Sequence, residues 1–149
     1  MSRARIPSNF FVFVIVEDRG RVLLVREAEH GQRWYAPAGG LEAGESIREA
    51  AIRETQEEAG ILVEPLGLLR VEQQWYPSES GEGLTSWWRY VLRARAVGSL
   101  TPKQRPDRHS LEARWVRPEE IALLPLRHSE VLDLVELALA NPPSMPLVA

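Results

Sequence analysis

The sequence predicts an α/β or α+β sandwich, and three features of its 149 residues lead to that expectation. Two apolar, β-branched runs, Phe10–Val16 and Arg21–Arg26, are separated by the turn signal EDRG and predict a β-hairpin. A further strand is predicted at Ser86–Val97, where side chains alternate between two faces. An amphipathic helix is predicted at Ser129–Ala140, and a second helical pattern lies between the strands. Strands interleaved with helices favour a sheet packed against helices.

The two hairpin runs are almost continuously hydrophobic, which is typical of strands covered on both faces of a sheet. The other strand candidates are RWYAP, which ends at Pro37, the strand-like stretch Leu66–Trp75, and the short run Glu112–Val116. The segment YPSESGEGLTS, residues 76–86, predicts a flexible loop because it is rich in Gly, Ser and Glu. A short helix is expected to begin at PEEIALL, with proline near its first position.

Alternation along Ser86–Val97 divides its side chains between the two faces of the predicted sheet. One face carries Trp88, Tyr90, Leu92 and Ala94, and the other carries Trp87, Arg89, Val91 and Arg93. Because the first face is otherwise apolar, we expect Trp88 to be a core residue. Ser129 precedes the apolar pattern of the last helix and is expected to be its N-cap.

Composition indicates a single globular domain over residues 1–140, followed by a proline-rich tail over residues 141–149. The net charge of −3 argues against a partner that is a nucleic acid polymer. The longest apolar run, FFVFVIV, is too short to span a bilayer, so no membrane partner is expected. Without a signal-peptide pattern or any cysteine, we expect a cytoplasmic protein with no disulfide framework.

The stretch after Gly39-Gly40 predicts a helix with well-defined ends. Ser46 and Glu49 form a capping box, and Gly60 is expected to end the helix. Within it, Arg53 can bridge the acidic residues four positions to either side, Glu49 and Glu57.

Three glutamates in this helix are placed where helix energetics disfavours them. Glu54, Glu57 and Glu58 share one face, and like charges at this spacing repel by up to roughly 0.5 kcal/mol per pair. They also lie at the C-terminal end, where the helix dipole disfavours acids by roughly 0.3–1 kcal/mol each. The same face continues into small apolar residues, which indicates that it points partly into the protein. A cluster of partly buried carboxylates needs a cation, and Mg²⁺ with oxygen ligands is the natural one.

The residue pattern here resembles the Nudix box, G-x5-E-x7-R-E-U-x-E-E-x-G-U, where U is aliphatic. The matching residues are Gly39, Glu45, Arg53, Glu54, Glu57, Glu58, Gly60 and Ile61. Thr55 at the first U position departs from the pattern in a way that affects packing and not ligands. A match of seven fixed residue types arises by chance at on the order of one in 10⁸ per starting position.

The resemblance implies an α/β/α sandwich with a mixed β-sheet between helices. It also implies hydrolysis of a diphosphate linked to a group X, in which water attacks phosphorus while Mg²⁺, or Mn²⁺, neutralises the phosphate oxygens. Glu54, Glu57 and Glu58 would be the metal-ligating carboxylates, with the Gly39 carbonyl as a further ligand.

The resemblance assigns further roles around that metal. Glu45 would lie near the metal cluster or hold the loop, and Arg53 would orient the glutamates. The general base that accepts a proton from water would be Glu54 or, as in family members that use an acid from a later loop, Glu112.

The wider chain resembles Nudix enzymes that hydrolyse 8-oxo-guanine nucleoside diphosphates. The similar stretches are WYAPAGGLEAGE, EEAGILVEPLGLLRVE, SWWRYVLRA and PLRHSEVLDLVELA. A purine would need an aromatic or apolar slot, for which the candidates are Trp34, Trp75, Tyr76, Trp87 and Phe11. Trp87 shares a face with Arg89, so we expect Trp87 to stack on the base and Arg89 to lie near a phosphate or base edge.

Two alternatives remain at this point. Pro77 lies sixteen residues after Ile61, a spacing that resembles pyrophosphatases for ADP-ribose or other nucleotide sugars. The other alternative is a non-catalytic Nudix-fold ligand sensor, against which the intact glutamate set argues. The partner expected from the sequence is a small nucleotide, and the protein is expected to be a monomer or a homodimer.

Overall fold

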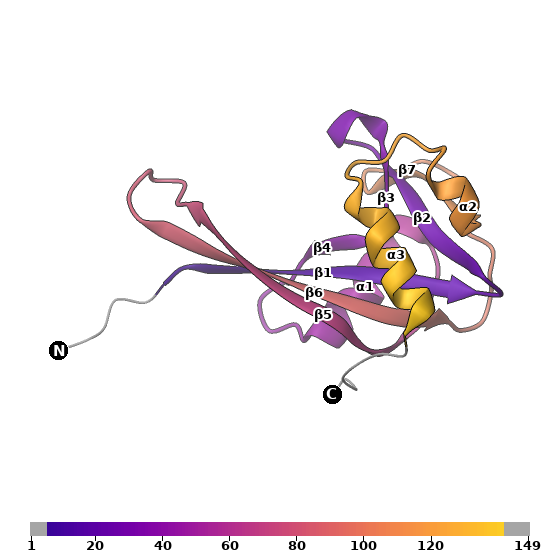
Figure 1. Ribbon diagram of the computed structural model, residues 1–149, viewed down its shortest axis with the longest axis horizontal. Helices are drawn as coiled ribbons and strands as arrows, with labels where there is room; N and C mark the ends of the chain where they lie inside the picture. Colours follow the sequence, from indigo (N-terminus) through magenta and orange to yellow (C-terminus); the bar gives the residue numbers. More distant parts are fainter. Residues whose placement is uncertain (1–5, 142–149) are drawn as a thin grey trace.

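Strand β1 (Ser8–Asp18) lies at the centre of a seven-stranded sheet in the computed structural model, which describes residues 6–141 (Figure 1). The strand order is β3-β2-β1-β6-β5, with β4 also paired to β1 and β7 to β2. The sheet is mixed because β1 and β6 are parallel while the other pairs are antiparallel. The remaining elements are β2 (Arg21–Glu27), η1 (His30–Gln32), β3 (Trp34–Tyr35), β4 (Ala38–Gly40), α1 (Ile47–Ala59), β5 (Val63–Pro77), β6 (Leu84–Ala96), β7 (Ser110–Val116), α2 (Pro118–Ile121) and α3 (Glu130–Ala140).

Each face of the sheet has its own hydrophobic core. Val12, Val14 and Val16 of β1 pack with buried alanines of α1 on one face. Phe13 and Ile15 point to the other face, where they pack with α2 and α3. Every one of these five β1 side chains is fully buried. The predicted burial of both sheet faces is therefore confirmed, as is the α/β/α sandwich.

Helix α1 has the ends that the sequence predicts. The Ser46 hydroxyl accepts a hydrogen bond from the Glu49 N–H, and the Glu49 carboxylate accepts one from the Ser46 N–H. Gly60 ends the helix in the left-handed conformation, with φ of 71°. Near this end the Glu58 carbonyl accepts from the buried Ser110 hydroxyl, and the Ala59 carbonyl accepts from the Lys103 N–H. These donors satisfy carbonyls that a helix otherwise leaves open.

Helix α3 begins directly after Ser129, the predicted N-cap position, but the serine side chain does not cap it. Ser129 has helical dihedral angles and its hydroxyl accepts from no backbone N–H. His128 takes this role instead, because its Nδ1 accepts from the Glu130 N–H at 3.1 Å.

Strands β5 and β6 extend beyond the rest of the sheet as a long hairpin arm, accompanied by the start of β1 (Figure 1). The segment predicted as a flexible loop, residues 76–86, is therefore strand at both ends, and residues 78–83 connect β5 to β6. Trp88 lies on this arm and is only partly buried, so the prediction that it is a core residue is wrong. The helices that cover the sheet do not extend over the arm (Figure 1).

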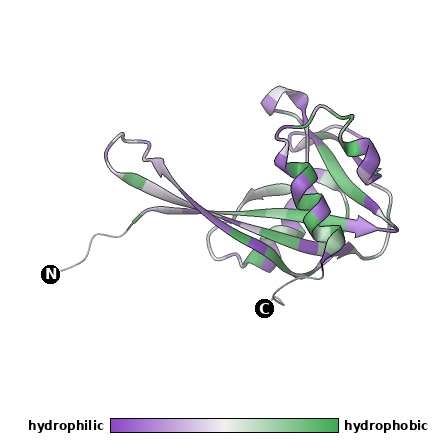
Figure 2. Cartoon of the chain, in the orientation of Figure 1, coloured by the Kyte–Doolittle hydropathy of each residue, from purple (hydrophilic) through white to green (hydrophobic). Residues whose placement is uncertain are grey.

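Hydrophobic residues are concentrated in the strands of the sandwich, and the helices alternate polar and apolar positions (Figure 2). None of the helices within residues 6–141 is long and apolar enough to cross a membrane. Of the predicted tail, residues 142–149 lie outside the described part of the chain.

Candidate active site

Arg53 is the centre of a cluster of acidic side chains along α1. Its guanidinium donates to Glu45 through Nε at 2.7 Å and Nη2 at 2.9 Å, and to Glu54 through Nη1 at 2.9 Å. Nη1 also donates to Glu57 at 3.2 Å, and Nη2 to the Gly40 carbonyl at 2.9 Å. These hydrogen bonds raise the pKa of Arg53 above its ordinary value, and the bond to Glu45 has the largest effect. Arg53 therefore joins α1 to the loop before it and to β4.

Glu45, and not Glu49, is the acidic partner of Arg53 on the N-terminal side of the cluster. The Glu49 carboxylate is engaged in the capping box, so the expected bridge from Arg53 to Glu49 is wrong. Glu45 lies in the loop before α1, accepts from both Arg53 and the Glu42 N–H, and is only 11% exposed. The hydrogen bond from Arg53 lowers the pKa of Glu45 below its ordinary value, so this carboxylate stays charged.

Strand β4 brings the backbone directly against two of the three glutamates. A Cβ atom added to Gly39 would lie 2.1 Å from Oε1 of Glu54, so only glycine leaves room for this carboxylate. Next to it, the Ala38 N–H donates to Oε2 of Glu58 at 3.3 Å. The predicted metal-site residues Gly39, Glu54 and Glu58 are therefore neighbours.

The carboxyls of Glu54 and Glu58 are incompletely compensated. Burial raises the pKa of Glu58 above its ordinary value of 4.5, and the charge of Glu54 raises it further. Burial also raises the pKa of Glu54, although Arg53 acts in the opposite direction. Two adjacent acids with raised pKa values indicate a site short of positive charge.

A divalent cation fits this donor set. Within residues 6–141, no three His, Asp or Glu side chains already stand together in a metal-binding arrangement. Glu54 and Glu57 instead hold the guanidinium of Arg53, which lies at their side. Mg²⁺ prefers oxygen ligands, which these carboxyls supply without a compensating charge. The missing Cβ of Gly39 leaves space beside Glu54.

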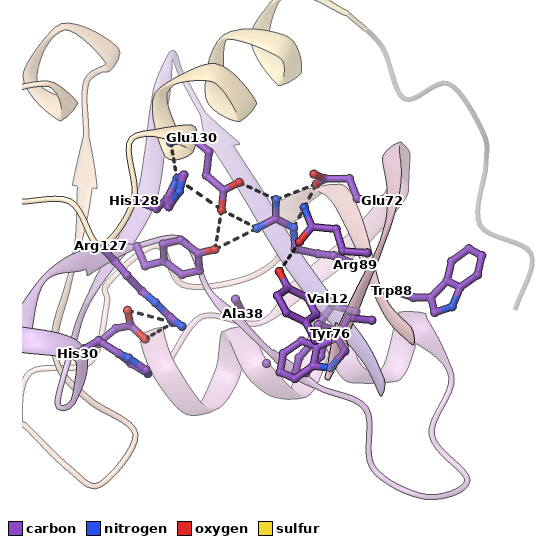
Figure 3. A pocket seen from close by; sticks show the side chains of 16 residues that line it. Val12, His30, Ala38, Glu72, Tyr76, Trp88, Arg89, Arg127, His128 and Glu130 are labelled. Carbon is purple, nitrogen blue, oxygen red and sulfur yellow. Dashed lines mark hydrogen bonds and ion pairs between the residues drawn. The ribbon is translucent and has the colours of Figure 1, made fainter. Parts of the chain in front are cut away.

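A cavity of about 620 Å³ opens beside β4 (Figure 3). It is lined by Phe11, Val12, Glu27, His30, Tyr35, Ala38, Gly39, Glu72, Gln74, Tyr76, Trp87, Trp88, Arg89, Arg127, His128 and Glu130. Ala38 and Gly39 thus line the cavity and also contact the glutamates of α1. Strand β4 is a wall shared by the cavity and the acidic cluster.

Arg89 is bound by two carboxylates at the cavity wall (Figure 3). It donates to both oxygens of Glu130, at 2.6 and 2.8 Å, and twice to Oε1 of Glu72, at 3.1 and 2.8 Å. Nη1 also donates to the Tyr35 hydroxyl at 3.1 Å, and burial raises the pKa of Tyr35 to about 12. All the donor nitrogens of Arg89 are thus engaged within the protein. Its expected position near a phosphate is not supported, because its charge is already compensated.

Aromatic rings form another wall of the cavity. Phe11 and Trp87 stack with ring centroids 4.8 Å apart and an angle of 23° between the planes. Tyr76 packs edge-on against Trp87, with centroids 5.1 Å apart. Trp87 is still 40% exposed, so one of its surfaces remains available. Three of the predicted slot residues are therefore brought together.

Other predicted residues lie away from the cavity lining. Trp34 is 3% exposed and packs in the core on the α3 side of the sheet, which does not support a substrate contact. Trp75 is 50% exposed, but it points to the opposite sheet face because Gln74 and Tyr76 on either side face the cavity. Glu112 on β7 is paired with Arg26 at 3.0 Å and with Arg114 at 2.9 Å.

Several cavity residues were not found by sequence reasoning. Tyr35 directly follows the candidate Trp34, and period-two alternation could have exchanged the two. Arg127 lies just before α3 and Glu130 is its first residue, and Arg127 pairs with Glu27, another lining residue, at 3.0 Å. Figure 3 shows Arg127 at one side of the cavity. No local motif marks these residues, because only the packing of α3 on the sheet brings them here.

The raised pKa of Glu58 predicts a pH-dependent stability in the absence of metal. Its neutral form is favoured in the folded protein, so above pH of about 4.5 the folded state binds more protons than the unfolded chain. The free energy of unfolding in chelator should therefore fall as pH rises from about 5 to about 8. Urea titrations should show this slope in the wild type and a flatter one in Glu58→Gln.

Glu79→Gln is the matched control, because Glu79 is an exposed carboxylate in the β5–β6 connection. It should retain the wild-type slope. A wild-type stability that does not change over this pH range would contradict the assignment of an uncompensated charge to Glu58.

Comparisons with known proteins identify the family of this chain. Residues 6–135 match the NUDIX domain. The 8-oxo-dGDP phosphatase NUDT18 of Mus musculus is 42% identical over 127 residues, which are 83% of this chain and 36% of that protein. The chain thus spans about a third of the length of this relative. Phosphatase NudJ of Escherichia coli is 36% identical over 111 residues, covering 74% of this chain and 69% of that protein.

A solved structure extends the comparison to the fold. A NUDIX hydrolase from Nitrosomonas europaea superposes with a TM-score of 0.75 at 29% identity, covering 94% of this chain and 93% of that one. The box residues meet at β4 and α1, the sandwich agrees with this structure, and the domain match covers most of the sequence. The chain belongs to the Nudix family.

Proposed function

We propose that this protein is a Mg²⁺-dependent hydrolase, also active with Mn²⁺, that cleaves the phosphoanhydride of a nucleoside diphosphate linked to X. Its preferred substrates are oxidised purine nucleoside diphosphates. The observation that carries the proposal is the position of β4, which contacts Glu54 and Glu58 on one side and lines the cavity on the other. A nucleotide in the cavity can therefore present its phosphates to the acidic cluster.

Glu54, Glu57 and Glu58 would hold the metal, with the Gly39 carbonyl beside them. The bound ion would neutralise phosphate oxygens and polarise the attacking water. Arg53 orients Glu54 and Glu57, because it is hydrogen-bonded to both. The reaction adds water across the P–O–P bond: one P–O bond forms, the anhydride bond breaks, and a proton passes to a base.

Glu54 is the better candidate for the base. Its carboxylate lies against Gly39 at the shared wall, and its raised pKa brings it closer to the range in which a carboxylate accepts protons effectively. Glu112 instead forms ion pairs with Arg26 and Arg114 on the β2–β7 side of the sheet, away from Gly39.

The base of the nucleotide would lie against the aromatic wall of Phe11, Tyr76 and Trp87. Beyond it the cavity is rich in acceptors, with carboxylates of Glu72 and Glu130. Guanine oxidised at C8 carries a proton on N7, so it offers an N–H donor where guanine has an acceptor. Such a base suits an acceptor-rich cavity, and the likeness to 8-oxo-dGDP phosphatases supports the same substrate class.

The nucleotide-sugar alternative receives less support. Pro77, whose spacing suggested it, ends β5 at the exposed tip of the hairpin arm and is paired with Leu84. The likeness to a solved ADP-ribose pyrophosphatase from Streptococcus suis has 17% identity and concerns the fold alone.

Product analysis with Mg²⁺ tests the substrate class. The value of kcat/KM for 8-oxo-dGDP should exceed those for dGDP and ADP-ribose by about 10-fold or more, because one lost polar contact already costs that much. Chromatography should identify 8-oxo-dGMP and phosphate as products. Faster turnover of ADP-ribose would favour the nucleotide-sugar alternative, and no turnover of any nucleotide would favour the ligand sensor.

The close approach at Gly39 gives a matched pair of variants. In Gly39→Ala the new Cβ would displace the Glu54 carboxylate, whereas in Gly40→Ala the nearest atoms lie at an ordinary 3.7 Å. Gly39→Ala should therefore lose roughly 10- to 100-fold in kcat/KM and most of its thermal stabilisation by Mg²⁺. Gly40→Ala should lose much less. Equal effects of the two variants would contradict the role of β4.

The choice of base is tested by two isosteric variants. Glu54→Gln should lower kcat by roughly 10²- to 10⁴-fold, since an amide accepts no proton from water. Glu112→Gln should change kcat only a few-fold, since its contacts are with arginines of the sheet. Steady-state kinetics at saturating Mg²⁺ measures both, and the reverse order of effects would make Glu112 the base.

A further inference from the structure

The hairpin arm exposes a second, apolar surface on the side opposite the cavity. Strand register places its side chains on one face, because paired residues of neighbouring strands point the same way. Phe10 is paired with Trp88, Val71 with Tyr90, Trp75 with Ser86, and Pro77 with Leu84. We define the arm face as Phe10, Val71, Trp75, Leu84, Trp88 and Tyr90. Figure 3 shows Trp88 pointing away from the cavity.

The arm face belongs to the same face of the sheet that α1 covers further along the strands. Further along the same face, Val12 and Leu92 are fully buried in the core that contains α1. Past the end of α1 the apolar alternation of β6 goes on through Tyr90 and Trp88, but no element among residues 6–141 is drawn over it (Figure 1). This explains why the sequence pattern predicted Trp88 as a core residue.

The apolar side chains of the arm face together expose a contiguous area. Phe10 is 41% exposed, Val71 42%, Trp75 50% and Leu84 55%. With the two partly buried aromatic residues, the arm face exposes on the order of 400 Å² of apolar surface. Contiguous apolar patches of this size are often functional, and larger ones mark protein interfaces. A stable interface buries about 800 Å² per partner, roughly half or more of it apolar, so the arm face suffices for its centre.

Charge distribution indicates which partner fits. Strand register places Ser8, Gln73, Pro77 and Ser86 beside the apolar residues, so this side of the arm carries no charged side chain at the paired positions. The cavity side of the same strands carries Glu72 and Arg89. Two identical uncharged faces can pack without like-charge repulsion, and an isologous contact is self-complementary.

We propose that the arm face packs against the arm face of a second copy of this chain, forming a two-fold symmetric homodimer. The contact leaves the cavity of each copy open, because the cavity lies on the opposite face of these strands. The proposal is independent of the proposed catalytic function.

Mass measurement over a range of concentrations tests it. Light scattering after size exclusion, from about 1 to about 100 µM, should give twice the chain mass of 16.9 kDa for the wild type. Val71→Lys and Trp75→Lys should each raise the dimer dissociation constant by about 10-fold or more, because the lysine would be buried without a partner. Circular dichroism should show that both variants stay folded.

Leu123→Lys is the matched control for added charge. Leu123 is 83% exposed and follows α2, at the end of the molecule away from the arm (Figure 1). This variant should dimerise like the wild type. If it weakens the dimer as much as Val71→Lys does, the contact is not the arm face and the proposal is overturned.

The absence of cysteine from the sequence allows a second test. Gln73 lies between Val71 and Trp75 on the arm face, so Gln73→Cys places one thiol near the proposed two-fold axis. A short bis-maleimide should join Gln73→Cys chains into dimers and leave Leu123→Cys chains largely unjoined. Equal cross-linking would overturn the proposal. A wild type that stays monomeric at all concentrations would also overturn the proposal. If Val71→Lys then lowers the melting temperature of that monomer, the arm face is covered by the same chain.

Discussion

The compensation of carboxylate charge by Arg53 is the interaction on which the active site depends. Helix α1 ends with three glutamates and no basic residue in its last turn, an arrangement that repulsion and the helix dipole both disfavour. Arg53 offsets part of that cost through hydrogen bonds to Glu45, Glu54 and Glu57. The same guanidinium binds the Gly40 carbonyl and so fixes α1 against β4. Glu58 receives no hydrogen bond from Arg53 and its pKa is raised by burial, so the cost of charging it stays uncompensated within the described residues.

A second arginine cluster shapes the cavity on the other side of β4. Arg89 on β6 joins Glu72 on β5, Glu130 on α3 and Tyr35 on β3. The β5–β6 hairpin is thereby tied to β3 and α3, which are far from it in the sequence, and burial gives these charge-assisted bonds more strength than they would have in water. The result is a firm binding surface with no free arginine at this position. In the proposed function, phosphate binding would fall to the acidic cluster with a metal, and base recognition to the aromatic rings and acceptors.

Local sequence rules were sufficient to predict helix α1 and the directions of the strand side chains. The capping box of Ser46 and Glu49 and the left-handed Gly60 depend on contacts within a few residues, so the sequence predicts them correctly. The same holds for β6, whose two faces have the predicted residues. Prediction failed where the outcome depends on the rest of the chain. Trp34 and Tyr35 are neighbours buried in the same core, yet only Tyr35 also lines the cavity, which the local pattern leaves undecided.

The sequence by itself determined the acidic helix, its caps and the alternation of the strands, because spacing along the chain imposes these features. It also determined the family, since the box residues occur at set intervals. Tertiary structure decided which faces are covered, which carboxylates bind Arg53 and Arg89, and which residues line the cavity. Trp88 illustrates the difference: alternation puts it on an apolar face, but burial requires another element above that face, and α1 ends before it reaches the arm. Packing between distant segments, and not the local pattern, sets the surroundings of each side chain.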